Sequence, residues 1–168
     1  RTTMSAPALS YAAGLIKTMP EFSILFRPNV NSYRRFDYKS WSPENASWGY
    51  DNRSAALRAI RQPGRNAFRF EHRVPGADTN MYLVLAAMLA GGHLGLTSKL
   101  APLAGAEGNA ALDPNWARLP SSLPEATEMF RNSEIAKDYL GSAFVEHYAA
   151  SRDIEWQHWL AWQAEQVT

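Results

Sequence analysis

Phe-Arg-Phe-Glu-His-Arg-Val, residues 68–74, is the stretch on which the fold prediction depends. Side chains alternate between the two faces of a strand, so Arg69, Glu71 and Arg73 fall on one face. The apolar side chains and His72 fall on the other face, and a Pro-Gly pair at 75–76 ends the run. We therefore expect a strand over residues 66–74, with one face packed on a core and the other presenting an Arg-Glu-Arg set.

Apolar spacing and turn residues predict the elements on either side of this strand. Expected helices cover residues 7–19, 79–90 with Asp78 or Thr79 as the N-cap, a segment from Ser122, 133–141 and 142–166. Residues 23–26 are a strand candidate, and residues 54–60 fit a strand or a short helix, of which we favour the strand. A turn is expected at 62–64, an aromatic loop at 29–52 and an irregular loop at 97–120.

Composition bounds the class of protein. The chain has 168 residues, 46% of them hydrophobic and 12% aromatic, which is enough to bury a core. It has no cysteine, and this excludes disulfides, thiolate metal sites and cysteine nucleophiles. The longest apolar run, 81–96, is shorter than the roughly 20 residues of a membrane span. No signal peptide opens the chain and both ends look cut, so we expect a cytoplasmic fragment with no membrane partner.

The formal net charge of +1 conceals a division along the chain. Residues 1–75 carry 12 Lys and Arg against 5 Asp and Glu, a net of +7, and residues 76–168 carry 5 against 11, a net of −6. An asymmetry of this size indicates an anion-binding region in the first part. The acidic second part fits solvated helix faces.

Several arginines accompany the Arg-Glu-Arg strand, namely Arg34, Arg35, Arg53 and Arg58. The planar guanidinium group matches carboxylate and phosphate oxygens bidentately. Several arginines around one carboxylate suit a nucleoside triphosphate with Mg²⁺. A solvated strand face and a nucleic-acid patch are the alternatives, although a patch would not need the glutamate.

Four segments carry a family resemblance. They are Asn-Ser-Tyr-Arg-Arg at 31–35, Trp-Gly-Tyr-Asp-Asn-Arg-Ser-Ala-Ala at 48–56, Arg-Phe-Glu-His-Arg-Val-Pro-Gly-Ala-Asp at 69–78 and Asn-Met-Tyr at 80–82. In this order they resemble the glutamine synthetase superfamily, and the similarity continues through residues 82–95 and 119–126 to the C-terminal helix. The resemblance implies an α+β fold in which antiparallel strands form a half-barrel site backed by helices. It also implies that residues 1–168 are the C-terminal portion of the catalytic domain, without the N-terminal β-grasp domain, the first part of the catalytic domain and the upstream metal ligands.

The resemblance also implies an activity. Such enzymes use ATP and Mg²⁺ or Mn²⁺ to convert glutamate to γ-glutamyl phosphate, which an amine then converts to an amide. The matching positions assign roles to six residues: Arg35 and Arg73 to the glutamate carboxylates, Arg53 to the transferred phosphoryl group and the glutamyl oxygen, Arg58 and Arg69 together with Arg53 to ATP, and Glu71 to the metal. Without the upstream ligands, this chain alone is expected to be inactive.

One matching position departs from the ammonium-using enzymes. They carry a glutamate six residues beyond the arginine of the Ser-Tyr-x-Arg motif, whereas this chain has Trp41 six residues beyond Arg35. An indole offers a cation–π face but takes no proton. The chain therefore resembles the γ-glutamylpolyamine synthetase branch, with Trp41 at the acceptor site, unless Glu44 substitutes after a loop shift.

Three functions remain as hypotheses. The first is a glutamate–amine ligase that binds ATP, glutamate and an amine, forms homo-oligomeric rings such as dodecamers and binds no nucleic acid. The second is an ammonium-using glutamine synthetase. The third is a non-catalytic member of the fold, and a nucleic-acid module is a weaker alternative.

Overall fold

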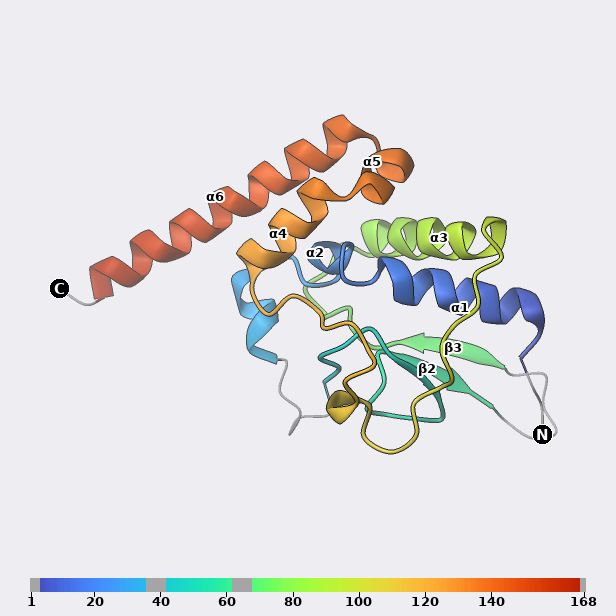
Figure 1. The fold of residues 1–168 in the computed structure, drawn as a ribbon. Coiled ribbons are helices and arrows are strands. Elements are labelled where there is room, and N and C mark those ends of the chain that lie inside the picture. The colour runs from blue at the N-terminus through green and yellow to red at the C-terminus, as the bar shows by residue number, and fades with distance from the viewer. Residues whose placement is uncertain (1–3, 36–41, 62–67, 167–168) are drawn as a thin grey trace.

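The computed structural model describes residues 4–35, 42–61 and 68–166. Two layers of helices lie over a small sheet, and the last helix projects from the body toward the C-terminus (Figure 1). The elements are, in chain order, α1 Ala6–Thr18, α2 Ser23–Phe26, η1 Val30–Arg35, β1 Trp48–Tyr50, β2 Leu57–Ile60, β3 Arg69–His72, α3 Met81–Thr97, η3 Ala110–Leu112, α4 Leu123–Asn132, α5 Glu134–Leu140 and α6 Ser142–Gln166.

The sheet has the order β1-β2-β3. Strands β2 and β3 are antiparallel, as expected, and Arg58 is paired in register with Glu71. Strands β1 and β2 are parallel, with Trp48 beside Leu57, so the sheet is mixed. The α+β class and the strands at 57–60 and 69–72 are confirmed, whereas the turn expected at 62–64 lies outside the described residues.

The predicted faces of β3 are confirmed. On the inner face the Phe70 ring stacks on Tyr11 at 6.2 Å, and the His72 ring lies 4.6 Å from Phe26. Val74, just after the strand, is fully buried. These contacts join the sheet to α1 and α2, so the opposite face, which carries Glu71, is left for the site.

The strand predicted at residues 23–26 is wrong, because this segment is the helix α2. The amide of Arg27 donates to the Ser23 carbonyl at 2.8 Å, and the Ser23 hydroxyl donates to the Met19 carbonyl at 2.8 Å. All four residues of α2 are buried. Periodicity cannot distinguish a short helix from a strand in a segment that is apolar on every side.

Helix α3 begins and ends later than predicted. Its N-cap is Asn80, whose side chain accepts from the Tyr82 amide at 3.0 Å. Asp78 or Thr79 was predicted as the cap, but Asp78 instead accepts from the Ser32 hydroxyl at 2.5 Å, and the Thr79 hydroxyl donates to the Gly76 carbonyl at 2.8 Å. The helix continues through Gly91, Gly92 and Gly95 because α1 packs against them closely: a Cβ at Gly95 would lie 2.0 Å from the Ser10 carbonyl oxygen.

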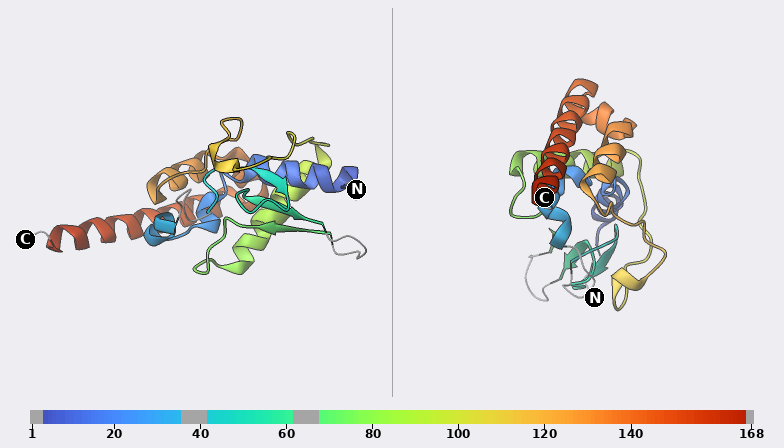
Figure 2. Two further views of the ribbon diagram at one scale, coloured as in Figure 1. Left: turned by 90° about the horizontal axis from the view of Figure 1, so that it is seen from below. Right: turned by 90° about the vertical axis from the view of Figure 1, so that its left-hand side faces the viewer.

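The C-terminal helices form as predicted. Ser122 caps α4, Ser133 caps α5, and Gly141 ends α5 with φ +87°. Helix α6 covers residues 142–166 and packs on α4 and α5. Its C-terminal part extends away from the body in the left view of Figure 2. Among the described residues, no helix has the length and apolar character that a membrane crossing requires.

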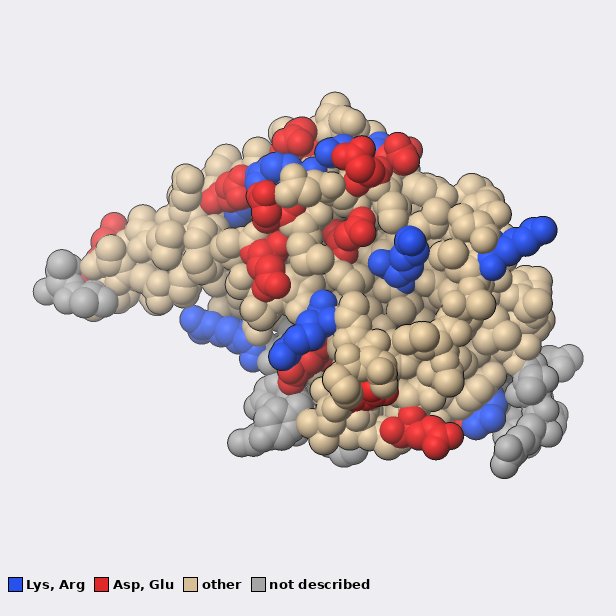
Figure 3. All heavy atoms as spheres, viewed as in Figure 1, with Lys and Arg blue, Asp and Glu red and all other residues tan. Residues whose placement is uncertain are grey.

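The acidic second part of the chain forms helix faces, as expected. Figure 3 shows acidic side chains gathered over α4–α6 with basic ones among them. Arg131 pairs with Glu128 at 3.2 Å and with Glu146 at 3.8 Å, and it also pairs with Asp153. The pairs with Glu146 and Asp153 join α4 to α6, and the pair with Glu128 lies within α4. These three carboxylates are therefore neutralised within the helical layer.

Candidate active site

The centre of the site is the carboxylate of Glu71 on β3. Arg58 faces it across the β2–β3 pair, with its Nη1 3.1 Å from Oε2. Arg73 reaches the other oxygen, with its Nε 3.5 Å from Oε1. The Glu71 side chain is 43% exposed, so this carboxylate lies at the surface of the sheet and not in the core. Two guanidinium groups therefore hold one accessible carboxylate.

Arg53 lies on a turn next to this pair. The Arg73 Nη1 donates to the Arg53 carbonyl and, at 3.4 Å, to the Ala55 carbonyl. The residues on both sides of Arg53 are anchored, whereas Arg53 itself is exposed. The turn thus holds the Arg53 backbone against Arg73, which pairs with Glu71, and leaves the Arg53 side chain exposed.

The other predicted residues are placed less completely. Arg69 is exposed at the start of β3, opposite Ile60 and on the same face of the strand as Glu71. Arg35 is the last residue of η1, and only its backbone is described. Trp41 lies outside the described residues. The structure therefore brings together Arg53, Arg58, Glu71 and Arg73.

Glu71 fits a divalent cation as a single ligand. Its oxygens are hard donors of the kind that Mg²⁺ and Mn²⁺ prefer. Within the described ranges, no three His, Asp or Glu side chains come together as a metal ion would require. A metal held by this chain would therefore need further ligands from elsewhere.

His72 and Tyr33 keep ordinary, uncharged forms. Burial lowers the pKa of His72 to about 4, and its Nδ1 accepts from the Val74 amide at 3.4 Å. The neutral ring is therefore a packed strand residue, as predicted. Burial is also the main cause that raises the pKa of Tyr33, despite the opposing charge of Arg27.

Sequence reasoning missed the side chains that hold the Arg53 turn. Asn52 donates to the carbonyls of Ala106 and Gly108 at 3.0 and 2.9 Å. Its Oδ1 accepts from the Ser54 amide at 2.9 Å, which makes an Asx-turn. The Asn-x-Ser pattern was the available signal, although it does not identify the distant carbonyls.

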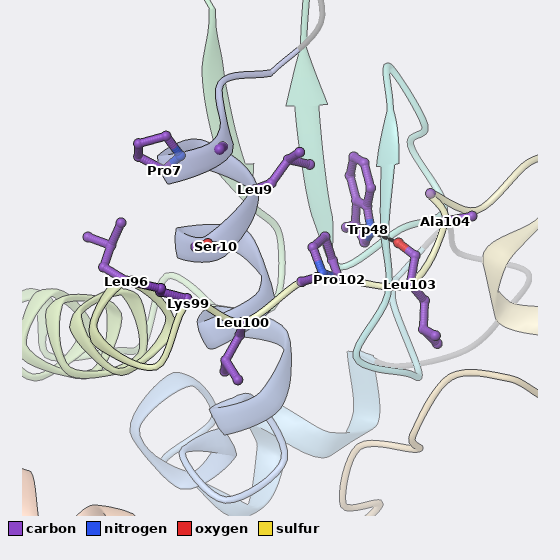
Figure 4. A pocket seen from close by; sticks show the side chains of 13 residues that line it. Pro7, Leu9, Ser10, Trp48, Leu96, Lys99, Leu100, Pro102, Leu103 and Ala104 are labelled. Carbon is purple, nitrogen blue, oxygen red and sulfur yellow. Dashed lines mark hydrogen bonds between the residues drawn. The ribbon is translucent and has the colours of Figure 1, made fainter.

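A large apolar pocket lies away from these charges. Its volume is about 720 Å³, and it lies between the start of α1, the end of α3, Trp48 and the loop at 99–105 (Figure 4). Lys99 is its one charged lining residue among the described residues. Leu9, Leu100 and Pro102 give it the character of a packing surface.

Known proteins resemble this chain over most of its length. It is 45% identical over 148 residues to a glutamate–isopropylamine ligase of Pseudomonas sp., covering 87% of this chain and 32% of the relative. It is 41% identical over 143 residues to the γ-glutamylputrescine synthetase of Escherichia coli K12, covering 85% of this chain and 30% of the relative. Proteins named glutamine synthetase also match.

Solved structures agree with these relatives. The structure titled as a GmaS/ADP complex superposes with a TM-score of 0.81 at 26% identity, covering 94% of this chain and 37% of that one. The chain thus spans about a third of the length of the proteins it matches. The family described as glutamine synthetase, catalytic domain, matches residues 1–166, and the chain therefore belongs to the glutamine synthetase family.

Proposed function

We propose that this chain is the C-terminal portion of the catalytic domain of an ATP- and Mg²⁺-dependent glutamate–amine ligase. The carrying observation is the carboxylate of Glu71, held between Arg58 and Arg73 beside the exposed Arg53. Phosphoryl transfer depends on positioning the phosphate groups and on stabilising their negative charge. The arginines supply cations for the phosphates, and Glu71 supplies a ligand for the metal ion.

The proposed reaction has two steps. A γ-carboxylate oxygen of glutamate attacks the γ-phosphorus of ATP, and the bond to the β-phosphate oxygen breaks to release ADP. The amine nitrogen then attacks the γ-glutamyl carbonyl carbon, phosphate leaves, and the nitrogen loses a proton to a base. The amide product therefore requires a deprotonating group near the acceptor.

This chain's residues divide the proposed work by charge. Arg53 stabilises the transferred phosphoryl group and the glutamyl oxygen, and Arg58 and Arg69 join it in holding the phosphates of ATP. Arg35 and Arg73 bind glutamate carboxylates. Glu71 holds Mg²⁺ or Mn²⁺, which when bound neutralises phosphate charge. The bidentate geometry of arginine supports the five arginine assignments, and the hard carboxylate oxygens of Glu71 support its role at the metal.

The acceptor is proposed to be an organic amine such as a polyamine. Trp41 occupies the position of the glutamate in ammonium-using enzymes, and an indole face attracts an alkylammonium group. Glu44 would have to replace that glutamate, yet its carboxylate lies 3.3 Å from Arg118. Its carbonyl also accepts from the Leu119 amide at 2.9 Å. A loop shift that freed Glu44 would break both contacts, and this supports the larger acceptor.

Two further proposals follow from the family. The family's sites lie between subunits, so we propose a homo-oligomeric ring. Because some matched relatives are named glutamine synthetases, ammonium is the first alternative acceptor. A non-catalytic member of the fold is the second alternative function.

The test is ATP-dependent phosphate release by the protein produced from its complete gene. The substrates are glutamate with putrescine, isopropylamine, ethanolamine or ammonium, each supplied alone as the amine. We expect release with organic amines. Phosphate release with ammonium but with no organic amine would overturn the proposal that the acceptor is an organic amine. No phosphate release with any amine would favour a non-catalytic member of the fold.

Variants of Glu71 and Arg53 test the site itself. Glu71→Gln keeps the shape of the side chain and removes its charge, and Arg53→Ala removes the exposed guanidinium group. We expect Glu71→Gln to abolish turnover and Arg53→Ala to lower kcat about 10²- to 10³-fold, as the loss of one transition-state donor does. Both should keep a melting temperature within about a few degrees of that of the unchanged protein, because surface ion pairs contribute little to stability. Glu128→Gln removes a carboxylate from the helical layer and serves as the control that keeps activity. Full activity of the Glu71 variant would contradict its role at the metal.

A further inference from the structure

We propose that Asn52 and Ser54 are positioning residues for Arg53, and that the backbone of residues 106–110 is the support against which they hold it. This inference rests on the proposed function, in which Arg53 acts on the transferred phosphoryl group. Both side chains use their polar atoms on the turn itself or on a loop more than 50 residues away in sequence.

Asn52 holds the turn from its N-terminal side. Its amide nitrogen donates to the carbonyls of Ala106 and Gly108, so two backbone oxygens of the loop fix the orientation of the side chain. Its Oδ1 then accepts from the amide and the hydroxyl of Ser54, at 2.9 and 2.7 Å. The amide group of Asn52 thus uses both donors and its acceptor.

Ser54 holds the turn from the other side. It is 4% exposed, and its Oγ accepts from the Ala110 amide at 2.8 Å. A hydroxyl has one proton to donate. Ser54 Oγ lies 2.7 Å from Asn52 Oδ1 and 3.2 Å from the Gly108 carbonyl oxygen, so Asn52 is the better placed acceptor. A buried hydroxyl with these partners is costly to remove, because the Ala110 amide would be left unsatisfied.

The loop is itself fixed to strand β1. The Ala106 amide donates to the Trp48 carbonyl at 2.8 Å, and the indole N–H of Trp48 donates to the Leu103 carbonyl at 2.8 Å. At Gly49 an added Cβ would lie 2.9 Å from both the Ala106 oxygen and the Asn52 Cβ. The loop and the turn therefore approach β1 too closely for any larger residue at position 49.

Within residues 52–54, Arg53 alone is exposed, while its two neighbours are held by hydrogen bonds. Arg73 adds a third tie through the Arg53 carbonyl. Rigid placement of a group that stabilises a transition state matters because a shift of about 1 Å can cost about 100-fold in rate. The hydrogen bonds around Arg53 are therefore assigned to placement of its guanidinium group.

A double-mutant cycle separates positioning from a general effect on folding. Ser54→Ala alone should lower kcat about ten- to hundredfold, with KM for ATP changed less than about threefold. In the Arg53→Ala background the same change should have no further effect, because Ser54 acts through Arg53. Ser54→Thr, which keeps the hydroxyl, should restore much of kcat.

Asn115→Ala is the matched control. Asn115 lies in the same irregular loop beyond residues 106–110, and its side chain donates to the Asp113 carboxylate at 2.8 Å. We expect it to keep kcat. Additive losses in the Ser54–Arg53 cycle, or an equal loss in Asn115→Ala, would overturn the positioning role even where Arg53→Ala shows the low residual kcat that the proposed function requires.

Hydrogen exchange gives a reading that does not depend on activity. In Ser54→Ala, amides of residues 51–56 and of 106–110 should both exchange faster, whereas in Asn115→Ala the turn should stay protected. Unchanged exchange at 51–56 in Ser54→Ala would refute the mechanical link between loop and turn. Full activity of Arg53→Ala, with the link intact, would instead refute the proposed role of Arg53.

Discussion

Glu71 pairs with Arg58 and Arg73. Removing one of these arginines is therefore predicted to change the affinities for a metal ion and for a nucleotide in opposite directions. Arg58 Nη1 lies 3.1 Å from Glu71 Oε2, so a cation that takes this carboxylate competes with Arg58. Phosphate groups, by contrast, would bind Arg58. Replacing Arg58 with Gln should therefore tighten Mn²⁺ binding in the absence of nucleotide and weaken nucleotide binding.

The magnitudes follow from exposure. The side chains of Arg58 and Glu71 are 20% and 43% exposed, and ion pairs near the surface contribute about 0.5–1 kcal/mol. Releasing the carboxylate should tighten Mn²⁺ binding about two- to fivefold. Charge-assisted hydrogen bonds to phosphate contribute about 1.5–3 kcal/mol, so ADP affinity at saturating Mn²⁺ should fall about ten- to hundredfold.

The assay is titration of the protein produced from its complete gene, with free Mn²⁺ measured by electron paramagnetic resonance and ADP binding by calorimetry. Arg61→Gln is the control, because it removes the same charge one residue beyond β2. Arg61 pairs with Asp51 at 3.5 Å and lies 4.0 Å over the Tyr50 ring, so it does not touch Glu71.

Two results would refute this reasoning. The first is weaker Mn²⁺ binding by Arg58→Gln without nucleotide, which would mean that Arg58 assists the carboxylate as a metal ligand. The second is an equal gain in Arg61→Gln, which would mean that the effect comes from net charge and not from competition for Glu71.

Three further predictions concern packing, pH and backbone strain. Gly95→Ala should lower the free energy of unfolding by about 1–3 kcal/mol or more, measured by urea denaturation, because its Cβ would meet the backbone oxygen of Ser10 at 2.0 Å. Burial lowers the pKa of His72 to about 4, so between about pH 6.5 and 4 the unfolded ring takes up a proton that the folded ring does not. The free energy of unfolding should therefore fall as the pH drops through this range, by at most about 1.4 kcal/mol per pH unit. His72→Gln should flatten this slope in denaturation measured from pH 7 to 4, and an unchanged slope would exclude His72 as its source. Gly108→Ala and Gly141→Ala both place alanine at positive φ, +70° and +87°, with no atom within 4 Å of the new Cβ. Both should lower the melting temperature through backbone strain. Only Gly108→Ala should lower kcat, because the Gly108 carbonyl accepts from Asn52.

The sequence predicted those parts of the fold whose signal is local. Alternation along residues 68–74 defined the faces of β3, and Ser122, Ser133 and Gly141 marked helix ends by capping chemistry that each residue carries itself. The strand prediction for residues 23–26 was wrong because all four residues are buried, and their sequence therefore shows no alternation of polar and apolar positions. Helix α3 was predicted too short because its glycines, which usually end helices, are required there by the close approach of α1.

The support of the Arg53 turn could not be predicted for a different reason. Asn52 and Ser54 bind the loop almost entirely through backbone groups of residues 106–110, and every residue offers a carbonyl. An Ala- and Gly-rich segment therefore gives no sign in sequence that it supports a site. Only the tertiary fold brings this loop to a turn more than 50 residues earlier in the chain.

The charge asymmetry of the chain is better understood from how the arginines are paired. In the first 75 residues the net charge is +7, yet Arg58 and Arg73 bind Glu71, and Arg61 binds Asp51. A surface that binds the nucleic-acid backbone gains affinity from cations that release counterions, and cations already paired with carboxylates contribute little to that gain. A small ligand that brings phosphates and a metal ion together satisfies both members of each pair, because the phosphates take the arginines while the metal takes the carboxylate. The pairing around Glu71 therefore favours a metal–nucleotide site over a nucleic-acid surface, although both are compatible with the same net charge.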